Sequence, residues 1–542
     1  MSARRNGALK HFEGCTRRRL PALLDLETRA AAVGGSGPGR SLNDDELKEI
    51  ARHLLPTDLR NASAADKAVR RTAANLIAFA KKYNLKSFPD DWFGLILDIS
   101  TATQLNTDDG VKPFFNDLST SSTLHLRVIP NSPGMQMSSI YMYTSRFVLL
   151  WQTACIMYTE ERQQIKGLKS LDVRYKFNTE AVLNMFLCGI RIFTSLENLR
   201  ITSSSTRLVR RPREPVFLQP GTSLTKEFTT TLTALRQLKR IDLISLSIND
   251  VSSIGYLCDG LLALRYLSSL TVQDCILSED TWVQLATTLK STSRLSTLHI
   301  TQPADRSFRV EVDDSIVEPL KAMFREQHHM TSVSVCGTGL GRACIAALSQ
   351  VDTASITFLD LSQNVLRQKT LNYGLVEILQ SVEFLANVKH LSMRNTGLSH
   401  ADIPALVTMI ERMHNLENIN LSGDSNTHLC YFYDVNLDEN MQEQRNLFAA
   451  LSTRTRLQTI KISDVSVPQI EVLYNIVQND AHAFPKLKLT HITFLRIGDE
   501  QINKIVQAVE AMPEHIQNRL KIGWWWNTSD ELDIWTSYLY TT

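Results

Sequence analysis

A short apolar motif recurs along the chain and limits its fold more than any other feature of the sequence. The motif reads apolar-x-x-apolar-x-apolar, often followed by Asn, Cys or Thr and a further apolar residue. Two clear copies are LSSLTVQDCIL at 267–277 and ITFLDLSQNVL at 356–366. Eleven copies place their second apolar residue at positions 171, 199, 241, 270, 298, 333, 359, 391, 419, 460 and 495. The base unit is therefore about 28 residues, with insertions in some copies.

The spacing within each copy has a physical explanation. Alternation in a short strand directs both apolar residues, such as Leu270 and Val272, to the same face. The Asn, Cys or Thr side chain is expected to satisfy backbone groups where the chain leaves the strand. Helical runs such as 282–289 and 403–413 lie between copies. No repeat can bury its own face, so stacking must supply the core. The pattern is typical of leucine-rich repeats and predicts an α/β solenoid, or horseshoe, of about 11–12 repeats.

Composition divides the chain into segments around this array. We expect a basic disordered tail at 1–40, which ends in a glycine-rich linker, and a small all-α module at 41–84. A connecting and N-terminal capping region is expected at 85–165, and the repeats at 166–515. An aromatic C-terminal cap is expected at 516–542, because four of the seven tryptophans fall there and the open end of a solenoid needs covering.

Charge and hydropathy exclude several classes of protein. The 542 residues hold 58 Lys and Arg against 56 Asp and Glu, so bulk charge does not indicate a nucleic-acid binder. No uncharged apolar run approaches the length of a membrane span, so no membrane association is expected. The cysteines form no C-x-x-C pair, which favours a reducing compartment, cytoplasm or nucleus. Residues 1–40 carry eight basic and three acidic residues, which leaves a mitochondrial presequence as an alternative.

The segment SLNDDELKEIARHLLPTDLRNAS at 41–63 carries a second pattern. Acidic residues are followed by apolar residues at helical spacing and then by Pro-x-Asp-Leu, and the segment resembles an F-box. The later Val-Cys-Lys-x-Trp-Arg element of that family is matched only at Lys67 and Arg70. The resemblance implies binding to a Skp-type adaptor and, through it, to a cullin. The residues it would direct at the adaptor are Leu42, Leu47, Ile50, Leu54, Pro56 and Leu59. The alternative is a helical bundle that caps the N-terminal end of the solenoid.

The sequence carries no motif for catalysis or for a cofactor. We find no phosphate-binding glycine loop, nucleophile elbow, zinc-protease motif or EF-hand. The adjacent His328 and His329 would lie on different helix faces, so no metal site is expected. The densest basic group outside the tail lies in an insertion and comprises Arg207, Arg210, Arg211 and Arg213. It is interpreted as a solvated loop, with a phosphate, an RNA backbone or an acidic partner as the alternative ligands.

Strand alternation also predicts the residues that face away from the core, on the concave side. They are Asp172, Arg174, Arg200, Asp242, Thr271, Gln273, His299, Asp360, Ser362, Arg394, Asn420, Lys461 and Arg496. Both signs of charge are present, which suits a protein partner better than a polyanion.

Taken with the F-box resemblance, the repeats predict a non-enzymatic substrate receptor of a cullin–RING ubiquitin ligase, with an unknown protein substrate on the repeat surface. The alternatives are a repeat scaffold in a larger assembly, mitochondrial if 1–40 is a presequence, and a Ran-type GTPase-activating protein. The latter protein ends in an acidic tail, whereas this chain ends in an aromatic-rich stretch.

Overall fold

The computed structural model describes residues between 79 and 538, with gaps. The longest gaps are 130–139, 204–221, 303–313, 365–385, 423–436, 464–474, 496–506 and 526–535. The predicted tail and nearly all of the predicted helical module lie in residues 1–78, outside the described residues.

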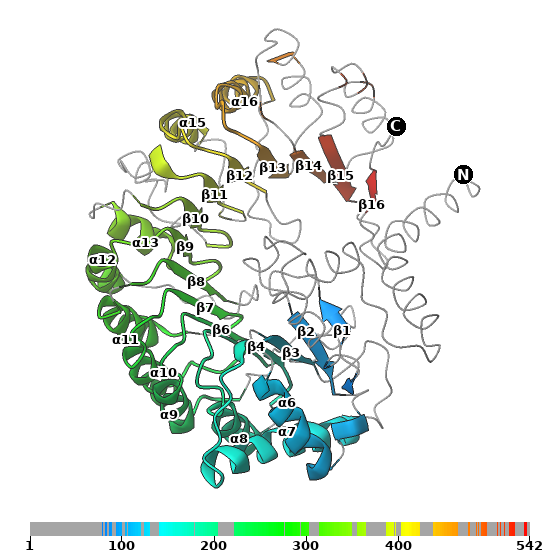
Figure 1. The fold of residues 1–542 in the computed structure, drawn as a ribbon. Helices are drawn as coiled ribbons and strands as arrows, with labels where there is room; N and C mark the ends of the chain where they lie inside the picture. The colour runs from blue at the N-terminus through cyan, green and yellow to red at the C-terminus, as the bar shows by residue number, and fades with distance from the viewer. Residues whose placement is uncertain are drawn as a thin grey trace, which may run out of the picture.

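The described strands form one sixteen-stranded sheet in which spatial order follows chain order. Every neighbouring pair from β2 to β15 is parallel, whereas β1 and β16 pair antiparallel at the two ends. Figure 1 shows the sheet following a curved path, with β1 and β16 at its ends. The strands are β1 (Lys86–Phe88), β2 (Gly94–Asp98), β3 (Leu124–Ile129), β4 (Leu168–Arg174), β5 (Asn198–Thr202), β6 (Arg240–Ile244), β7 (Ser269–Gln273), β8 (Thr297–Thr301), β9 (Ser332–Ser334), β10 (Phe358–Asp360), β11 (His390–Ser392), β12 (Asn418–Asn420), β13 (Thr459–Ser463), β14 (Leu489–Leu495), β15 (Leu520–Trp525) and β16 (Thr536–Tyr538).

The described α-helices lie between successive strands from β2 to β10 and from β11 to β13, and they cover the outer face of the curve (Figure 1). The α-helices are α6 (Asp108–Thr120), α7 (Ile140–Thr159), α8 (Glu180–Ile190), α9 (Lys226–Ala234), α10 (Val251–Leu262), α11 (Glu279–Lys290), α12 (Val317–Glu326), α13 (Gly341–Leu348), α15 (Ile403–Arg412) and α16 (Leu437–Ser452). Two 3₁₀ helices are η1 (Thr103–Leu105) and η4 (Asp314–Ile316). Polar side chains cap several helices; Asp250, for example, accepts a hydrogen bond from the Ser253 amide at the start of α10. Within the described helices, no segment has the length and apolar character that a membrane crossing requires.

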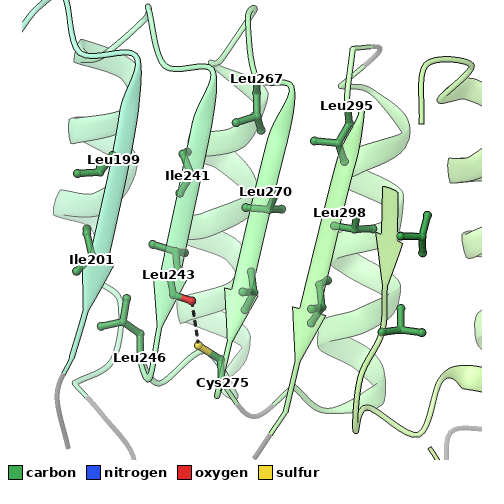
Figure 2. Close-up of a cluster of buried hydrophobic side chains, with 14 of the residues drawn as sticks. Leu199, Ile201, Ile241, Leu243, Leu246, Leu267, Leu270, Cys275, Leu295 and Leu298 are labelled. Carbon is green, nitrogen blue, oxygen red and sulfur yellow. Dashed lines mark hydrogen bonds between the residues drawn. The ribbon is translucent and has the colours of Figure 1, made fainter. Parts of the chain in front are cut away.

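The repeat motif occupies the strand positions that the sequence predicts. Leu270 and Val272 in β7 are both buried, and the residue between them lies on the opposite face. Parallel register aligns the second apolar residue of each copy with that of the next, so Leu199, Ile241 and Leu270 form one row. Figure 2 shows this row continuing to Leu298, between the sheet and the helices. The predicted α/β leucine-rich-repeat solenoid is therefore confirmed.

Polar side chains satisfy backbone carbonyls where each repeat leaves its strand. The Asn364 amide donates to the carbonyls of Val335 and Leu361, at 2.9 and 2.7 Å. Thr396 donates to the carbonyl of Met393 at 2.8 Å in the next repeat. The Cys275 thiol lies 3.9 Å from the Leu243 carbonyl of the preceding strand (Figure 2). The predicted role of the Asn, Cys or Thr position is confirmed in these repeats.

The parallel sheet continues beyond the predicted repeat boundary at residue 166. Strands β2 and β3 and helices α6 and α7 lie within 85–165 and repeat the same strand–helix alternation. Leu126 of β3 pairs with Leu171 of β4, so β3 joins the apolar row in register. In the predicted aromatic cap at 516–542, β15 continues the parallel sheet and β16 closes it antiparallel.

Aromatic side chains fill the core at the N-terminal end of the solenoid. Trp151 of α7 is fully buried and contacts Phe186 of α8 edge-on, with ring centroids 4.8 Å apart. The two helices approach closely at Gly189, where an added Cβ would lie 2.7 Å from the Trp151 carbonyl oxygen. A glycine is therefore required at this crossing.

Candidate functional site

One side chain per strand faces away from the helices and forms a row across the concave face. It is the residue between the two buried apolar positions, and parallel register places each beside the next. From β3 to β13 the row reads Arg127, Asp172, Arg200, Asp242, Thr271, His299, Ser334, Asp360, Ser392, Asn420 and Lys461. A single protein partner lying along the curve would contact many of these strands.

The first four members of the row alternate in charge and belong to an ion-pair network. Arg127 donates through Nε to Asp172 Oδ2, which also lies 3.5 Å from Arg174 Nη2. Arg200 donates through Nη2 to Asp242 Oδ2 at 2.8 Å, and its Nη1 lies 4.0 Å from Asp172 Oδ2. Arg240 Nη2 lies 3.0 Å from Asp242 Oδ2. The arginine–aspartate cluster comprises Arg127, Asp172, Arg174, Arg200, Arg240 and Asp242.

Burial separates the two aspartates of the arginine–aspartate cluster from two of its four arginines. The two aspartate side chains are each only 1% exposed, whereas the Arg174 and Arg240 side chains are 42% and 39% exposed. Four guanidinium groups surround two carboxylates, so the cluster has an excess of two positive charges. Strands β3–β6 contain no other acidic residue. Arg174 and Arg240 are therefore the side chains of the cluster that solvent reaches most.

Imidazole and aromatic side chains form a second group on the concave face, over β8–β12. The Phe358 ring is half-buried, with centroids 5.5 Å from His299 and 6.0 Å from His390. His299 Nε2 lies 2.7 Å from the Ser332 hydroxyl, and His390 Nδ1 lies 2.7 Å from the Asn418 amide nitrogen. Burial lowers the pKa of His299 below its usual value, which favours the neutral ring at neutral pH. We call these five residues the histidine–phenylalanine group.

A second row of charges follows the edge of the sheet where the strands begin. Glu197 accepts hydrogen bonds from Lys169 at 2.8 Å and from Lys239 at 2.7 Å. Partial burial alone would raise the pKa of Glu197, but the two lysines lower it and hold the carboxylate ionised. Glu197 therefore bridges the lysines of two neighbouring repeats at this edge.

The structure brings some of the predicted concave residues together and separates others. Asp172, Arg174, Arg200 and Asp242 meet in the arginine–aspartate cluster, whereas Gln273, Asp360, Arg394 and Lys461 lie farther along the sheet. Thr271, His299 and Asn420 belong to the middle row, and Ser362 follows β10. Four predicted groups fall outside the described residues: Arg496, the basic insertion Arg207, Arg210, Arg211 and Arg213, the adaptor-facing set Leu42, Leu47, Ile50, Leu54, Pro56 and Leu59, and the tail.

Sequence reasoning missed two arginines of the cluster. Arg240 stands directly before the Ile241–Leu243 pair, at a strand position that the alternation rule assigns to the concave face. Arg127 lies in the segment LHLRVI, whose alternating apolar residues could have marked it as a strand of the array. The sequence therefore held a signal for each arginine. The signal for Arg127 lies in a segment before the motif copies, and the signal for Arg240 lies within the copy that contains Ile241 and Leu243.

The search for metal-binding groups finds none in the described part of the chain. No three His, Cys, Asp or Glu side chains there are placed to hold a metal ion, and His328 and His329 are both exposed at the end of α12. Burial raises the pKa of Cys275 and of Cys344 to about 12, so both thiols stay protonated.

Comparison with known proteins finds solved structures of low similarity to this chain. No family model matches the sequence, and no curated protein matches it significantly. The leucine-rich repeat-containing protein LegL7 of Legionella pneumophila is 18% identical over 53% of this chain and 88% of its own, with a TM-score of 0.32. An internalin of Listeria monocytogenes, InlF, is 11% identical over 68% of this chain and 92% of its own, with a TM-score of 0.31. A Bacteroides fragilis protein is 12% identical, over 67% and 78%, with a TM-score of 0.24.

Proposed function

We propose that the chain is a non-enzymatic recognition protein, and more specifically the substrate receptor of an SCF-type cullin–RING ubiquitin ligase. The observation that carries the recognition role is the continuous concave row, in which parallel register places one side chain per strand, from β3 to β13, on the face away from the helices. The F-box resemblance of residues 41–63, on the N-terminal side of the array, supports the ligase role.

The proposed mechanism uses two separate surfaces. The apolar stripe predicted from the sequence at 42–59 would bind a Skp-type adaptor, and the adaptor would bind the cullin. The concave face would hold the substrate. Holding a substrate lysine near the ligase-bound ubiquitin raises its effective concentration, so the receptor contributes positioning and the ligase supplies the chemistry. We propose that the chain needs no cofactor and acts in the cytoplasm or nucleus.

Recovery of the adaptor tests this proposal. Tagged full-length chain should recover a Skp-type adaptor and a cullin from cell extract. Leu47→Asp combined with Leu54→Asp places charge on the predicted apolar stripe and should abolish that recovery. Lys48→Asp combined with His53→Asp is the matched control, because it adds two carboxylates to the same predicted helix off the stripe. Wild-type chain that recovers no adaptor contradicts the ligase proposal.

The basic segment 1–40 supports a second candidate, a repeat scaffold inside mitochondria. Imaging of a C-terminally tagged chain separates the two. Mitochondrial signal that disappears when residues 1–40 are removed favours the scaffold, whereas a cytoplasmic or nuclear signal in both forms favours the receptor.

A further inference from the structure

We infer that Cys155 and Cys188 form a redox-sensitive pair, whose two thiols a hydroperoxide oxidises to a disulfide within the chain. Cys155 lies on α7 and Cys188 lies on α8, the next helix along the array. The pair therefore belongs to the helical face of the array and not to the concave row. Its chemistry goes beyond the proposed recognition role and does not depend on it.

The packing of α7 against α8 brings the two cysteines together. The two helices lie side by side (Figure 1). They approach closely at Gly189, where an added Cβ would lie 3.3 Å from the Ala154 Cβ. Cys155 follows Ala154 and Cys188 precedes Gly189, so the cysteines flank this contact, and a hydrogen bond joins their thiols. Such proximity is what a disulfide requires, because cysteines whose side chains point apart cannot be bridged without backbone movement.

Exposure to solvent separates this pair from the cysteines of the core. Cys258, Cys275 and Cys344 are buried, as expected for small apolar side chains that serve packing. Cys155 and Cys188 are each partly exposed, so a small oxidant can reach them. The pair therefore combines the sulfur–sulfur contact and the solvent access that oxidation needs.

The two sulfurs take different parts in the oxidation. Burial, and then the hydrogen bond with Cys155, raise the pKa of Cys188 to about 12, so Cys188 keeps its proton. Cys155 attacks the hydroperoxide as a thiolate, the O–O bond breaks, and Cys155 becomes a sulfenic acid. The Cys188 sulfur then attacks the sulfenic sulfur, the S–O bond breaks, and the leaving hydroxide takes the Cys188 proton. With hydrogen peroxide, two thiols lose two electrons and one peroxide gains them, which gives one disulfide and two molecules of water.

The disulfide would tie two neighbouring helices of the array together. It closes the loop of chain between 155 and 188, which restricts the unfolded chain and so stabilises the folded form. Each unit of a solenoid contacts only its neighbours, so the effect should be local. We expect slower amide hydrogen exchange in α7 and α8 of the oxidised chain than of the reduced chain. Unchanged exchange in both helices would contradict this effect. In a reducing compartment the pair would stay as thiols until oxidation outpaces reduction.

Peptide mapping of the purified full-length chain tests the inference. The reduced chain is treated with hydrogen peroxide, its remaining thiols are blocked with N-ethylmaleimide, and it is digested with trypsin without reductant. Cys155 is the one cysteine of tryptic peptide 147–162, and Cys188 is the one cysteine of 177–191. We expect mass spectrometry to find these two peptides joined, in chain that runs as a monomer on a non-reducing gel, and dithiothreitol to separate them. Recovery of both peptides only with blocked or over-oxidised thiols overturns the inference, as does a link found only between chains.

Three single substitutions test the part that each sulfur takes. In Cys188→Ser, dimedone, a reagent for sulfenic acid, should label Cys155 at least fivefold more than in wild type, because no second thiol resolves the sulfenic acid. In Cys155→Ser, dimedone should label Cys188 only weakly. The matched control is Cys336→Ser, which removes another partly exposed thiol and should leave the link between 147–162 and 177–191 unchanged.

Equal labelling of Cys155 in wild type and Cys188→Ser overturns the inference, and so does loss of the link in Cys336→Ser. The wild-type peptide map needs no variant to fold, so it decides the matter even if a substitution prevents folding. Because the assay uses neither adaptor nor substrate, its result does not depend on the ligase proposal.

Discussion

We expect the concave network to be highly sensitive to a single substitution at Asp172. Its side chain is 1% exposed and lies against Arg127, whose side chain is only 6% exposed. Asp172→Asn keeps the shape of the side chain but removes its charge, which leaves the Arg127 guanidinium buried without its carboxylate. Breaking a buried pair from one side costs about 3–5 kcal/mol, so we expect the free energy of unfolding to fall by that amount.

A double-mutant cycle in urea denaturation, followed by tryptophan fluorescence, measures the interaction. Arg127→Met and Asp172→Leu are made singly and together, because apolar residues of similar size replace a buried pair at little cost. We expect each single substitution to destabilise strongly and the double variant to recover a large part of the loss. The resulting coupling energy should be about 2 kcal/mol or more.

An exposed ion pair provides the matched comparison. Lys112 and Glu161 lie 2.6 Å apart with side chains 47% and 32% exposed. Glu161→Gln should cost less than about 1 kcal/mol, because water solvates both partners. If Asp172→Asn costs no more than Glu161→Gln, the carboxylate is solvated and the reasoning about the cluster is refuted.

Three further predictions concern the fold and its pH dependence. Asn364→Ala should destabilise the protein by about 1–3 kcal/mol in urea denaturation, because it leaves buried carbonyls unpaired; Asn364→Thr should cost less, and equal costs would contradict this role. The lowered pKa of His299 means that its contribution to stability is complete above about pH 6.5 and is lost as the pH falls through the lower folded-state pKa. The midpoint of thermal unfolding should therefore fall more steeply with decreasing pH in wild type than in His299→Gln. An equal pH dependence of the two midpoints would contradict this role of His299. Gly189→Ala should destabilise by about 1–3 kcal/mol, since its Cβ would meet the Trp151 carbonyl, whereas Gly260→Ala meets only a Leu side chain and should be nearly neutral in the same denaturation assay.

The repeat array was predictable from the sequence because each copy obeys the same local rule. In a copy with the motif intact, the apolar pair predicts a buried strand face, as Leu270 and Val272 do. The Asn, Cys or Thr position predicts the turn that follows, as Asn364 does. Strand β3 was harder to find, since its segment LHLRVI lacks the Asn, Cys or Thr position. Its membership depends on pairing with β4, a contact between distant residues that local pattern does not encode.

The arginine–aspartate cluster was only partly predictable for a related reason. Alternation identified Asp172 and Asp242 as concave residues, and the structure places them in the concave row. Alternation also implies exposure, whereas both carboxylates are 1% exposed because neighbouring arginines cover them. That burial arises from register between strands about 28 to 45 residues apart along the chain. A single sequence gives the spacing of the strands but not the pairing of their side chains across them.

Hydrogen–deuterium exchange of the full-length chain, with and without purified Skp-type adaptor, tests the central claim of two separate binding surfaces. We expect the adaptor to slow amide exchange in residues 41–59 and to leave strands β3–β6 unchanged within error. Unchanged exchange at 41–59, or protection confined to the repeats, would contradict the account.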